Sequence, residues 1–165
     1  SDVYKRQVVH GGGQEYGLRS GTVNLPMAVS MVKSIKLTMG RLDEARRKLN
    51  KMNQSVRTFL EEFRGVYINS PKDSAPQIIN VSFPGVKGEV LVNAFSKHGV
   101  MISTTSACSS KRGKLNEVLL AMGVPDARIE GSIRISMGVH TTEEDIQRFK
   151  EVFEQVYEEV KELLK

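Results

Sequence analysis

The sequence predicts an α+β fold in which a short sheet is covered by helices and preceded by long connecting helices. Apolar residues recur at helical spacing across roughly residues 26–63. After Gly65 the period changes, and short β-branched segments alternate with short helical ones. With 165 residues, 39% hydrophobic and 26% charged, the chain has room for one globular domain, or for a small domain and part of another.

The first part of the chain is expected to form a loop and two helices. Residues 10–21, HGGGQEYGLRSG, hold five of the fourteen glycines, a density that favours a loop. Asn24 is expected to cap the first helix, with Pro26 in its first turn. Gly40 interrupts the helical pattern, and a second helix is expected over roughly residues 41–63.

The remainder is expected to alternate between strands and helices. We predict strands at residues 66–68, 77–83, 100–103 and 132–136, and helices at residues 89–97, 115–122 and 142–164. His98 and Gly99 provide a C-cap for the first of these helices. For the last helix, Thr142 with Asp145, or the pair one residue earlier, fits a capping box.

The composition argues against several classes of protein. The formal charge is +5, but Lys and Arg alternate with acids as on solvated helix faces, so direct nucleic-acid binding is not expected. No apolar run approaches the roughly 20 residues that cross a bilayer, so neither membrane association nor a signal peptide is expected. One cysteine and three scattered histidines provide neither a disulfide nor zinc-ligand spacing, and the single thiol suits the cytoplasm.

Cys108 lies in ISTTSACSSKRGK, residues 102–114, where Ser and Thr precede it and basic residues follow it. A reactive thiol is partly exposed near positive charge, whereas a structural cysteine lies among apolar neighbours. The segment therefore favours a functional thiol, although an inert exposed cysteine in a basic loop would have the same sequence.

Two further segments can bind anions. In RSGT, the glycine backbone, the Thr22 hydroxyl and the Arg19 guanidinium beside a helix start are typical of a phosphate site, and a flexible loop between domains is an equal alternative. In SIRIS, alternation puts Arg134 on the face opposite Ile133 and Ile135. If that face lines a cleft, Arg134 can hold a carboxylate; if it faces solvent, Arg134 is an ordinary exposed arginine.

Three segments in this order carry a family resemblance: HGGGQEYGLRSGTVNLP, FPGVKGEVLVNAFSKHGVMISTTSACSS and GSIRISMGVHTTEEDIQRF. They resemble the carboxyl-terminal part of cysteine desulfurases of the NifS/IscS type, which are pyridoxal 5'-phosphate (PLP) enzymes of the class V aminotransferase family. The resemblance runs from about Val8 to Leu164. It implies that residues 1–24 are a remnant of the large cofactor domain of a fold type I enzyme, that residues 25–64 are connecting helices, and that residues 65–165 are the small carboxyl-terminal domain with the Cys108 loop. Residues 1–7 match no motif and are interpreted as non-native.

The resemblance also implies a role for one residue of each segment. Cys108 corresponds to the nucleophile that takes the sulfur of L-cysteine as a persulfide, leaving L-alanine. The sulfur then goes to an acceptor protein for iron–sulfur cluster assembly or tRNA thiolation. Arg134 corresponds to the residue that pairs with the substrate carboxylate. Thr22 corresponds to a ligand of the cofactor phosphate, which the family supplies to the other subunit's active site in a homodimer.

The sequence departs from the family pattern at three points. Thr105 stands where the family commonly has glycine, and Val23 where it commonly has glutamate. The lysine that binds the cofactor belongs to a segment upstream of the glycine loop, and no lysine here corresponds to it. We therefore expect this chain alone to be inactive. The alternatives are a related PLP enzyme, such as a selenocysteine lyase or an aminotransferase, and a non-enzymatic binding domain.

Overall fold

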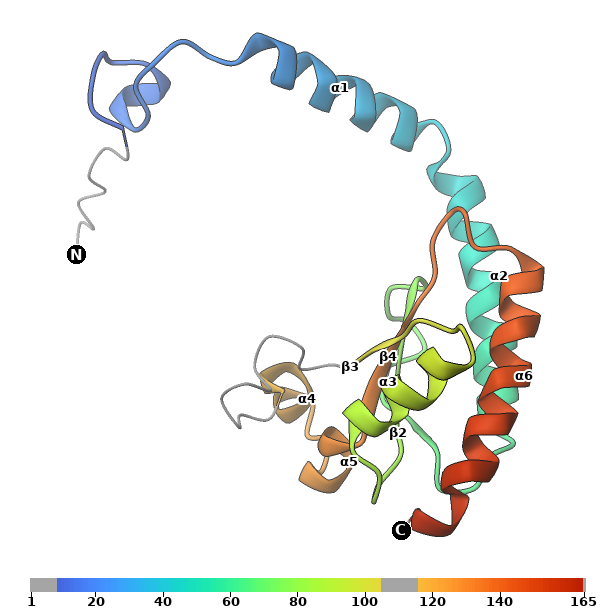
Figure 1. Ribbon diagram of the computed structural model, residues 1–165. Helices are drawn as coiled ribbons and strands as arrows, with labels where there is room; N and C mark the ends of the chain where they lie inside the picture. The colour runs from blue at the N-terminus through green and yellow to red at the C-terminus, as the bar shows by residue number, and fades with distance from the viewer. Residues whose placement is uncertain (1–8, 105–115, 165) are drawn as a thin grey trace. The chain divides into compact units, whose positions relative to one another are not determined.

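The computed structural model describes residues 9–104 and 116–164. The chain divides into two compact units, Ser1–Leu42 and Asp43–Lys165, and each is described by itself. The first unit contains the glycine loop with one 3-10 turn, η1 (Glu15–Gly17), and the helix α1 (Leu25–Met39) (Figure 1). The second contains the sheet, four helices packed with it or beside it, and the carboxyl-terminal 3-10 turn, together with all but the first residue of α2.

Helix α1 begins as predicted. The Asn24 Oδ1 atom accepts a hydrogen bond from the Met27 backbone N–H at 3.1 Å, and Pro26 lies in the first turn. The helix ends at Met39, where Gly40 forms the C-cap. Eight of its apolar side chains are nonetheless exposed: Leu25, Met27, Val29, Met31, Val32, Ile35, Leu37 and Met39. Because soluble proteins rarely expose so many apolar side chains together, α1 favours a covering surface that the described residues do not supply.

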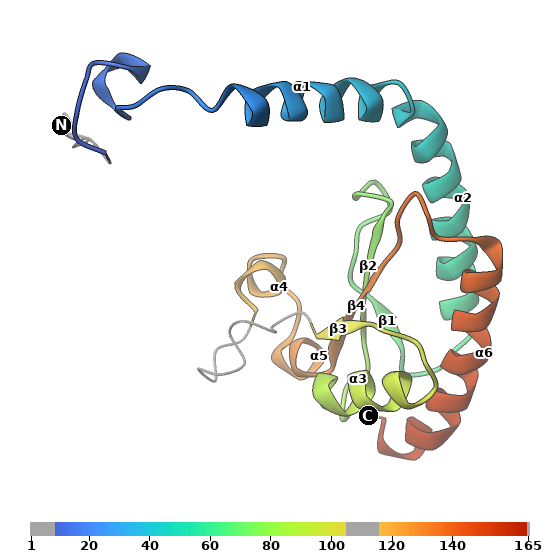
Figure 2. The ribbon, with the colours of Figure 1, turned by 45° about the horizontal axis from the view of Figure 1, so that its top comes forward.

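The sheet of the second unit has four antiparallel strands in the order β1-β2-β4-β3 (Figure 2). These are β1 (Tyr67–Ile68), β2 (Ile78–Ser82), β3 (Ser103–Thr104) and β4 (Ser132–Ser136). The prediction for β4 is confirmed. The third strand was expected from Val100, and this is wrong: the Val100 N–H instead donates to the Phe95 carbonyl at 3.1 Å and completes the end of the preceding helix.

Helices α2 (Leu42–Leu60), α3 (Gly88–Lys97) and α6 (Glu143–Val160) contribute to one hydrophobic core with the sheet. Helix α6 continues into η3 (Lys161–Leu163). Two short helices, α4 (Glu117–Ala121) and α5 (Asp126–Glu130), precede β4 in the chain. Helix α5 was not predicted, because a five-residue helix is too short to show a period. Residues 43–60 take part in this core, while the assignment of residues 25–64 as a connection between two domains stays a prediction.

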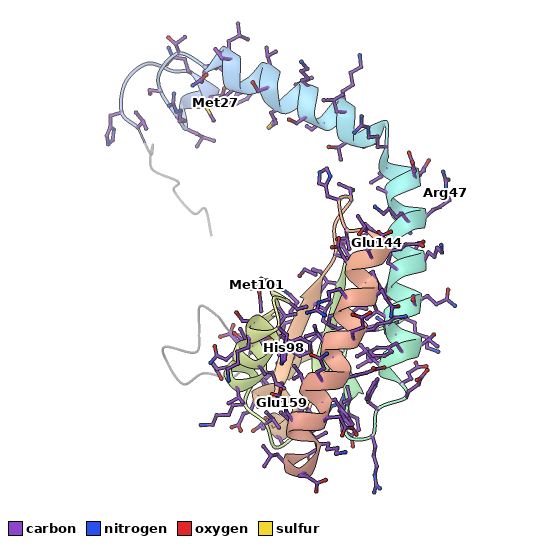
Figure 3. The ribbon with its side chains drawn as sticks, turned by 45° about the vertical axis from the view of Figure 1, so that its right-hand side comes forward. Met27, Arg47, His98, Met101, Glu144 and Glu159 are labelled. Atoms are coloured by element: carbon purple, nitrogen blue, oxygen red, sulfur yellow. The ribbon has the colours of Figure 1, made fainter. Side chains whose placement is uncertain are left out.

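Polar contacts fix how α6 begins and how it lies against α3. The capping box is confirmed: Thr142 Oγ1 accepts from the Asp145 N–H at 3.1 Å, and the Thr142 N–H donates to Asp145 Oδ2 at 2.8 Å. Near the end of α6, the α3 C-cap residue His98 lies beside this helix, with its Nε2 atom 3.3 Å from Glu159 Oε1 (Figure 3). Gly99 follows with φ +78°, which supports the predicted C-cap.

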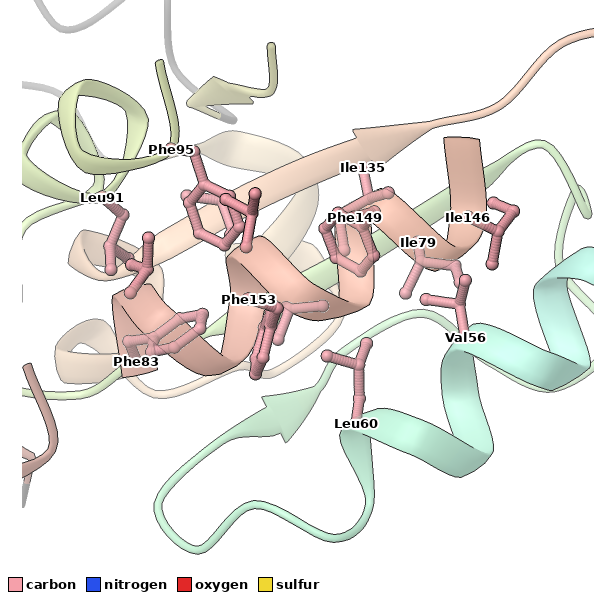
Figure 4. Packing of buried hydrophobic residues seen from close by; sticks show 14 of the residues in the cluster. Val56, Leu60, Ile79, Phe83, Leu91, Phe95, Ile135, Ile146, Phe149 and Phe153 are labelled. Carbon is pink, nitrogen blue, oxygen red and sulfur yellow. The ribbon is translucent and has the colours of Figure 1, made fainter. Parts of the chain in front are cut away.

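The core is aromatic around α6. Phe153, only 1% exposed, has ring centroids of five other phenylalanines within 6.0 Å: Phe59, Phe63, Phe83, Phe95 and Phe149. Figure 4 shows Phe153 with Phe83, Phe95 and Phe149. Helix α2 adds Val56 and Leu60, both fully buried. Rings that meet edge to face contribute about 0.5–1.5 kcal/mol per pair beyond the area that they bury. The cluster therefore joins α2, α3 and α6 to the sheet.

Just before β4, the backbone at Gly131 lies very close to the backbone of residues 83–86. A Cβ atom on Gly131 would lie 2.2 Å from the Phe83 carbonyl oxygen and 2.7 Å from the Val86 carbonyl oxygen. The Phe83 N–H donates to the Gly131 carbonyl at 2.9 Å in the same place. At the other end of the strand, a Cβ on Gly138 would meet nothing within 4 Å.

We expect Gly131→Ala to destabilise the protein by about 3 kcal/mol, because the new methyl group would displace the backbone at the entry to β4. Gly138→Ala is the matched control and should change the free energy of unfolding by less than about 0.5 kcal/mol. Urea unfolding of the 165-residue chain measures both. Equal stability of the two variants would mean that the approach at Gly131 relaxes at no cost.

Candidate functional site

The two faces of the sheet differ sharply in chemistry. Strands β2 and β4 pair with Asn80 opposite Arg134 and Ser82 opposite Ser132. Ile79, Val81, Ile133 and Ile135 lie on the other face and are buried in the core. The prediction that Arg134 lies opposite Ile133 and Ile135 is confirmed. The side of the sheet away from the core is therefore polar, and we call it the polar face.

Arg134 lies in the middle of the polar face. Its partner on β2 is Asn80 and its partner on β3 is Ser103. The residue is exposed. Of the ion pairs among the described residues, none involves Arg134. The strand neighbours of this guanidinium are neutral, and no described carboxylate pairs with it. It can therefore bind an external carboxylate through two parallel hydrogen bonds.

A partly buried polar network runs beside Arg134, and no sequence pattern predicted it. Asn69 Nδ2 donates to Asn80 Oδ1 and to Ser82 Oγ, both at 2.6 Å. Asn69 Oδ1 accepts from Arg128 Nη2 at 2.5 Å. Asn80 Nδ2 donates to the Ile133 carbonyl at 3.0 Å. Asn80 and Ser82 are 8% and 0% exposed, whereas Asn69 and Arg128 are half-buried, so the inner end of the network is shielded from water.

Arg128 is held at the outer end of this network. Its guanidinium carbon lies 4.7 Å from the centroid of the Tyr67 ring, within the range of a cation–π contact. Its Nε atom is buried and has no hydrogen-bond partner among the described residues. In the sequence, the alternation of Asn80 and Ser82 with Ile79 and Val81 was a usable signal, whereas the place of Arg128 depends on α5, which was not predicted.

The glycine loop of the first unit is closed by its own polar groups. Ser20 is 3% exposed, and its Oγ donates to the Gly12 carbonyl at 2.5 Å. The Gly21 N–H donates to Gln14 Oε1 at 3.2 Å. Gly21 has φ +107°, a conformation that favours glycine, and it directly precedes Thr22.

Thr22 follows this loop and is exposed, three residues before α1 begins. Arg19 donates to the Ser20 carbonyl at 3.0 Å, so its guanidinium braces the loop. An exposed hydroxyl next to glycine backbone just before a helix is compatible with the phosphate end of a cofactor. Thr22 belongs to the first unit and Arg134 to the second.

The predicted nucleophile, Cys108, lies outside the described residues. The last residue that the structure describes before Cys108 is Thr104. Thr104 pairs with Ile133, the residue next to Arg134. The chain is described again from Asn116, whose Oδ1 accepts from the Val118 and Leu119 N–H groups, both at 3.0 Å, and caps α4. The last described residue before Cys108, Thr104, therefore lies on β3, the strand that pairs with β4 next to Arg134.

Among residues 9–104 and 116–164, no three His, Cys, Asp or Glu side chains gather as metal ligands would. Within the same ranges, no helix combines the length and the apolar character that a membrane span requires.

Comparisons with known proteins agree on one family. The family model described as "Aminotransferase class-V" matches residues 2–149. The cysteine desulfurase IscS of Clostridium botulinum strain Hall is 35% identical over 162 residues, which cover 96% of this chain and 41% of that protein. A solved structure titled "NIFS-LIKE PROTEIN" matches with a TM-score of 0.75 at 34% identity, over 96% of this chain and 40% of that one. A NifS-like protein from Rickettsia africae matches with a TM-score of 0.76 at 26% identity, over 92% and 40%. The chain thus spans about two fifths of the length of these relatives.

We expect Ser82→Ala to cost about 1 kcal/mol, because the Asn69 carboxamide loses a buried acceptor that water does not replace. Ser136→Ala removes an exposed hydroxyl from the same face and should stay within about 0.5 kcal/mol of the parent. The midpoints of urea unfolding distinguish the two. A cost at Ser136 as large as that at Ser82 would contradict the burial of the network.

Proposed function

Because this chain belongs to the class-V aminotransferase family, we propose that it carries the sulfur-accepting and carboxylate-binding residues of a cysteine desulfurase. In this reaction L-cysteine is converted to L-alanine, and its sulfur is carried away as a persulfide. The names of the relatives support the reaction. The exposed Arg134 on the polar face, which forms no ion pair with a described residue, is the observation that carries the proposal.

The proposal includes pyridoxal phosphate as cofactor. When bound, this group supplies an electron sink for the chemistry of amino acids. The donor set of the glycine loop fits its phosphate: the Thr22 hydroxyl and the backbone beside Gly21 would hold it. No lysine of this chain is assigned to bind the cofactor.

Arg134 would bind and orient the substrate. Its guanidinium can donate two hydrogen bonds to one carboxylate, which fixes both the position and the rotation of the amino acid. Its strand partners Asn80 and Ser103 are neutral, so neither competes with the substrate carboxylate for the Arg134 guanidinium. Holding two reacting groups in the correct orientation can lower the activation barrier of their reaction by a large amount.

Cys108 would accept the sulfur. Its thiolate attacks the sulfur of the substrate, an S–S bond forms and the C–S bond breaks. The carbon keeps the electron pair of the broken bond and takes up a proton, which yields alanine. The thiol becomes a persulfide, Cys108–S–SH. The basic residues that follow, Lys111 and Arg112, would favour the thiolate.

The persulfide would pass to an acceptor protein, for iron–sulfur cluster assembly or tRNA thiolation, in the cytoplasm. We also propose that Thr22 completes the cofactor site of the other subunit in a homodimer. The exposed apolar side chains of α1, which follow Thr22 directly, support an arrangement in which this part of the chain is covered by a partner surface.

A chimera provides the background for kinetic tests. Residues 9–164 replace the matching segment of the Clostridium botulinum cysteine desulfurase, which supplies the rest of the cofactor site. We expect Cys108→Ala in this chimera to abolish persulfide formation and alanine release while the absorbance of bound cofactor is retained, because the thiolate acts only on bound substrate. Ser110→Ala is the control in the same segment. Sulfide release at the parental rate from Cys108→Ala would exclude Cys108 as the nucleophile.

Substitution of Arg134 tests the substrate contact. We expect Arg134→Ala to lower kcat/KM for L-cysteine by roughly ten- to hundredfold, the loss of a charge-assisted pair of about 1.5–3 kcal/mol. Arg134→Lys should recover little of this, since lysine keeps the charge and loses the planar fork. Steady-state kinetics in the chimera measures both variants. If neither variant changed kcat/KM, the carboxylate would be held elsewhere.

A further inference from the structure

Asn80 lies directly opposite Arg134 on the same face, so its carboxamide is the nearest neutral side chain on β2. Opposite residues of an antiparallel pair have Cβ atoms about 4.5–5.5 Å apart. If the Asn80 oxygen pointed toward β4, it would be a natural acceptor for the Arg134 guanidinium, which has only donors. A guanidinium bonded to Asn80 would be less available to a carboxylate from outside.

The network fixes the opposite orientation. Asn80 Oδ1 accepts from Asn69 Nδ2 at 2.6 Å, and Asn80 Nδ2 donates to the Ile133 carbonyl on β4 at 3.0 Å. The oxygen is therefore bonded to Asn69, on the β1 side, and the nitrogen is bonded to β4, the strand that carries Arg134. The amide nitrogen cannot accept a hydrogen bond from a guanidinium.

Both ends of the network impose the same direction on it. Arg128 can only donate, so Asn69 must present its oxygen to Arg128 and its nitrogen to Asn80. The Ile133 carbonyl can only accept, so Asn80 must present its nitrogen there. The two carboxamides lie between a donor-only and an acceptor-only group, and one orientation of each satisfies the whole chain of hydrogen bonds.

Arg128 is a costly group for this position. Its Nε is buried without a partner among the described residues, a loss of the kind that proteins generally avoid. A buried donor without a partner does not stabilise the fold, so Arg128 is a candidate for a role other than stability. Its Nη2 bond to Asn69 is the contact that orients the network.

We propose that Arg128, Asn69 and Asn80 form a positioning device that keeps the Asn80 carboxamide oxygen away from Arg134 and so leaves the Arg134 guanidinium free for a substrate carboxylate. Asn69 and Asn80 are positioning residues, because they act through Arg134 and need not touch the substrate. The carboxylate part of this inference rests on the proposed function, whereas the orientation of Asn80 does not.

The decisive variant is Asn69→Asp. Aspartate keeps an acceptor for Arg128 and loses the donor for Asn80, so the Asn80 carboxamide is expected to turn over and present its oxygen toward Arg134. In nitrogen-15 NMR of the 165-residue chain, the Arg134 Nε–H signal should move and exchange more slowly with water, since it is now hydrogen-bonded. Asn50→Asp, at an exposed position of α2, is the matched control and should leave the signal unchanged. An Arg134 signal that is the same in Asn69→Asp and in the parent would overturn the proposal.

Arg128→Met provides a second variant that does not bury a new charge. It removes the unsatisfied Nε, but also the donor to Asn69 Oδ1 and the contact with the Tyr67 ring, so the midpoint of thermal unfolding should fall modestly. The Arg134 signal should move in the same direction as in Asn69→Asp, by a smaller amount. Arg148→Met on α6 is the control for the loss of an arginine that donates to a carbonyl, here that of His98. A lowered unfolding midpoint with an unmoved Arg134 signal would reduce Arg128 to a structural role and refute the proposal.

Kinetics in the chimera tests the consequence for the substrate. Asn69→Asp should raise KM for L-cysteine about three- to tenfold with a smaller change in kcat, the effect of one competing hydrogen bond. In the Arg134→Ala background the same change should have no further effect, because the device acts through Arg134. An equal rise of KM with and without Arg134 would contradict that route. If Arg134→Ala itself leaves KM unchanged, the proposed function of Arg134 fails, and the NMR result still decides the orientation of Asn80.

Discussion

The antiparallel pairing of β2 with β4 is the constraint on which the rest of the second unit depends. In the observed register, every apolar side chain of both strand centres enters the core, and Asn80, Ser82, Ser132 and Arg134 all lie on the polar face. A slip by one residue would exchange the two faces completely. The same pairing that buries Ile133 and Ile135 therefore also exposes Arg134 and brings Asn80 beside it.

Two features hold this register from opposite sides. The aromatic cluster around Phe153 requires the apolar face of the sheet to meet α2, α3 and α6. On the polar face, Asn69 bonds to both the backbone and the side chain of Asn80, since its N–H donates to the Asn80 carbonyl at 2.9 Å. Packing and directional hydrogen bonds thus specify one alignment together, although each alone would permit more than one.

Sequence patterns were sufficient wherever a signal was local and repeated. The cap at Asn24, the capping box at Thr142 and the strand around Arg134 depend on neighbours within a few residues, and each is confirmed. The polar network could not be predicted, because it joins Asn69, Asn80 and Arg128 across as many as 59 positions in the chain. The same holds for the close approach at Gly131, which depends on how two loops meet. The start of the third strand was predicted too early, because a β-branched residue such as Val100 fits a strand start and also the end of the preceding helix.

The exposure of α1 has a consequence for ligand binding. Thr22 lies three residues before the first residue of this helix, so any surface that covers the apolar side chains of α1 also restricts the backbone around Thr22. An anion bound at Thr22 restricts the same backbone. Two events that order one segment share its entropic cost, so each favours the other even if the two ligands never touch. If an anion binds at Thr22 as proposed, coverage of α1 and occupancy at Thr22 are in this sense thermodynamically linked, and the loss of either weakens the other.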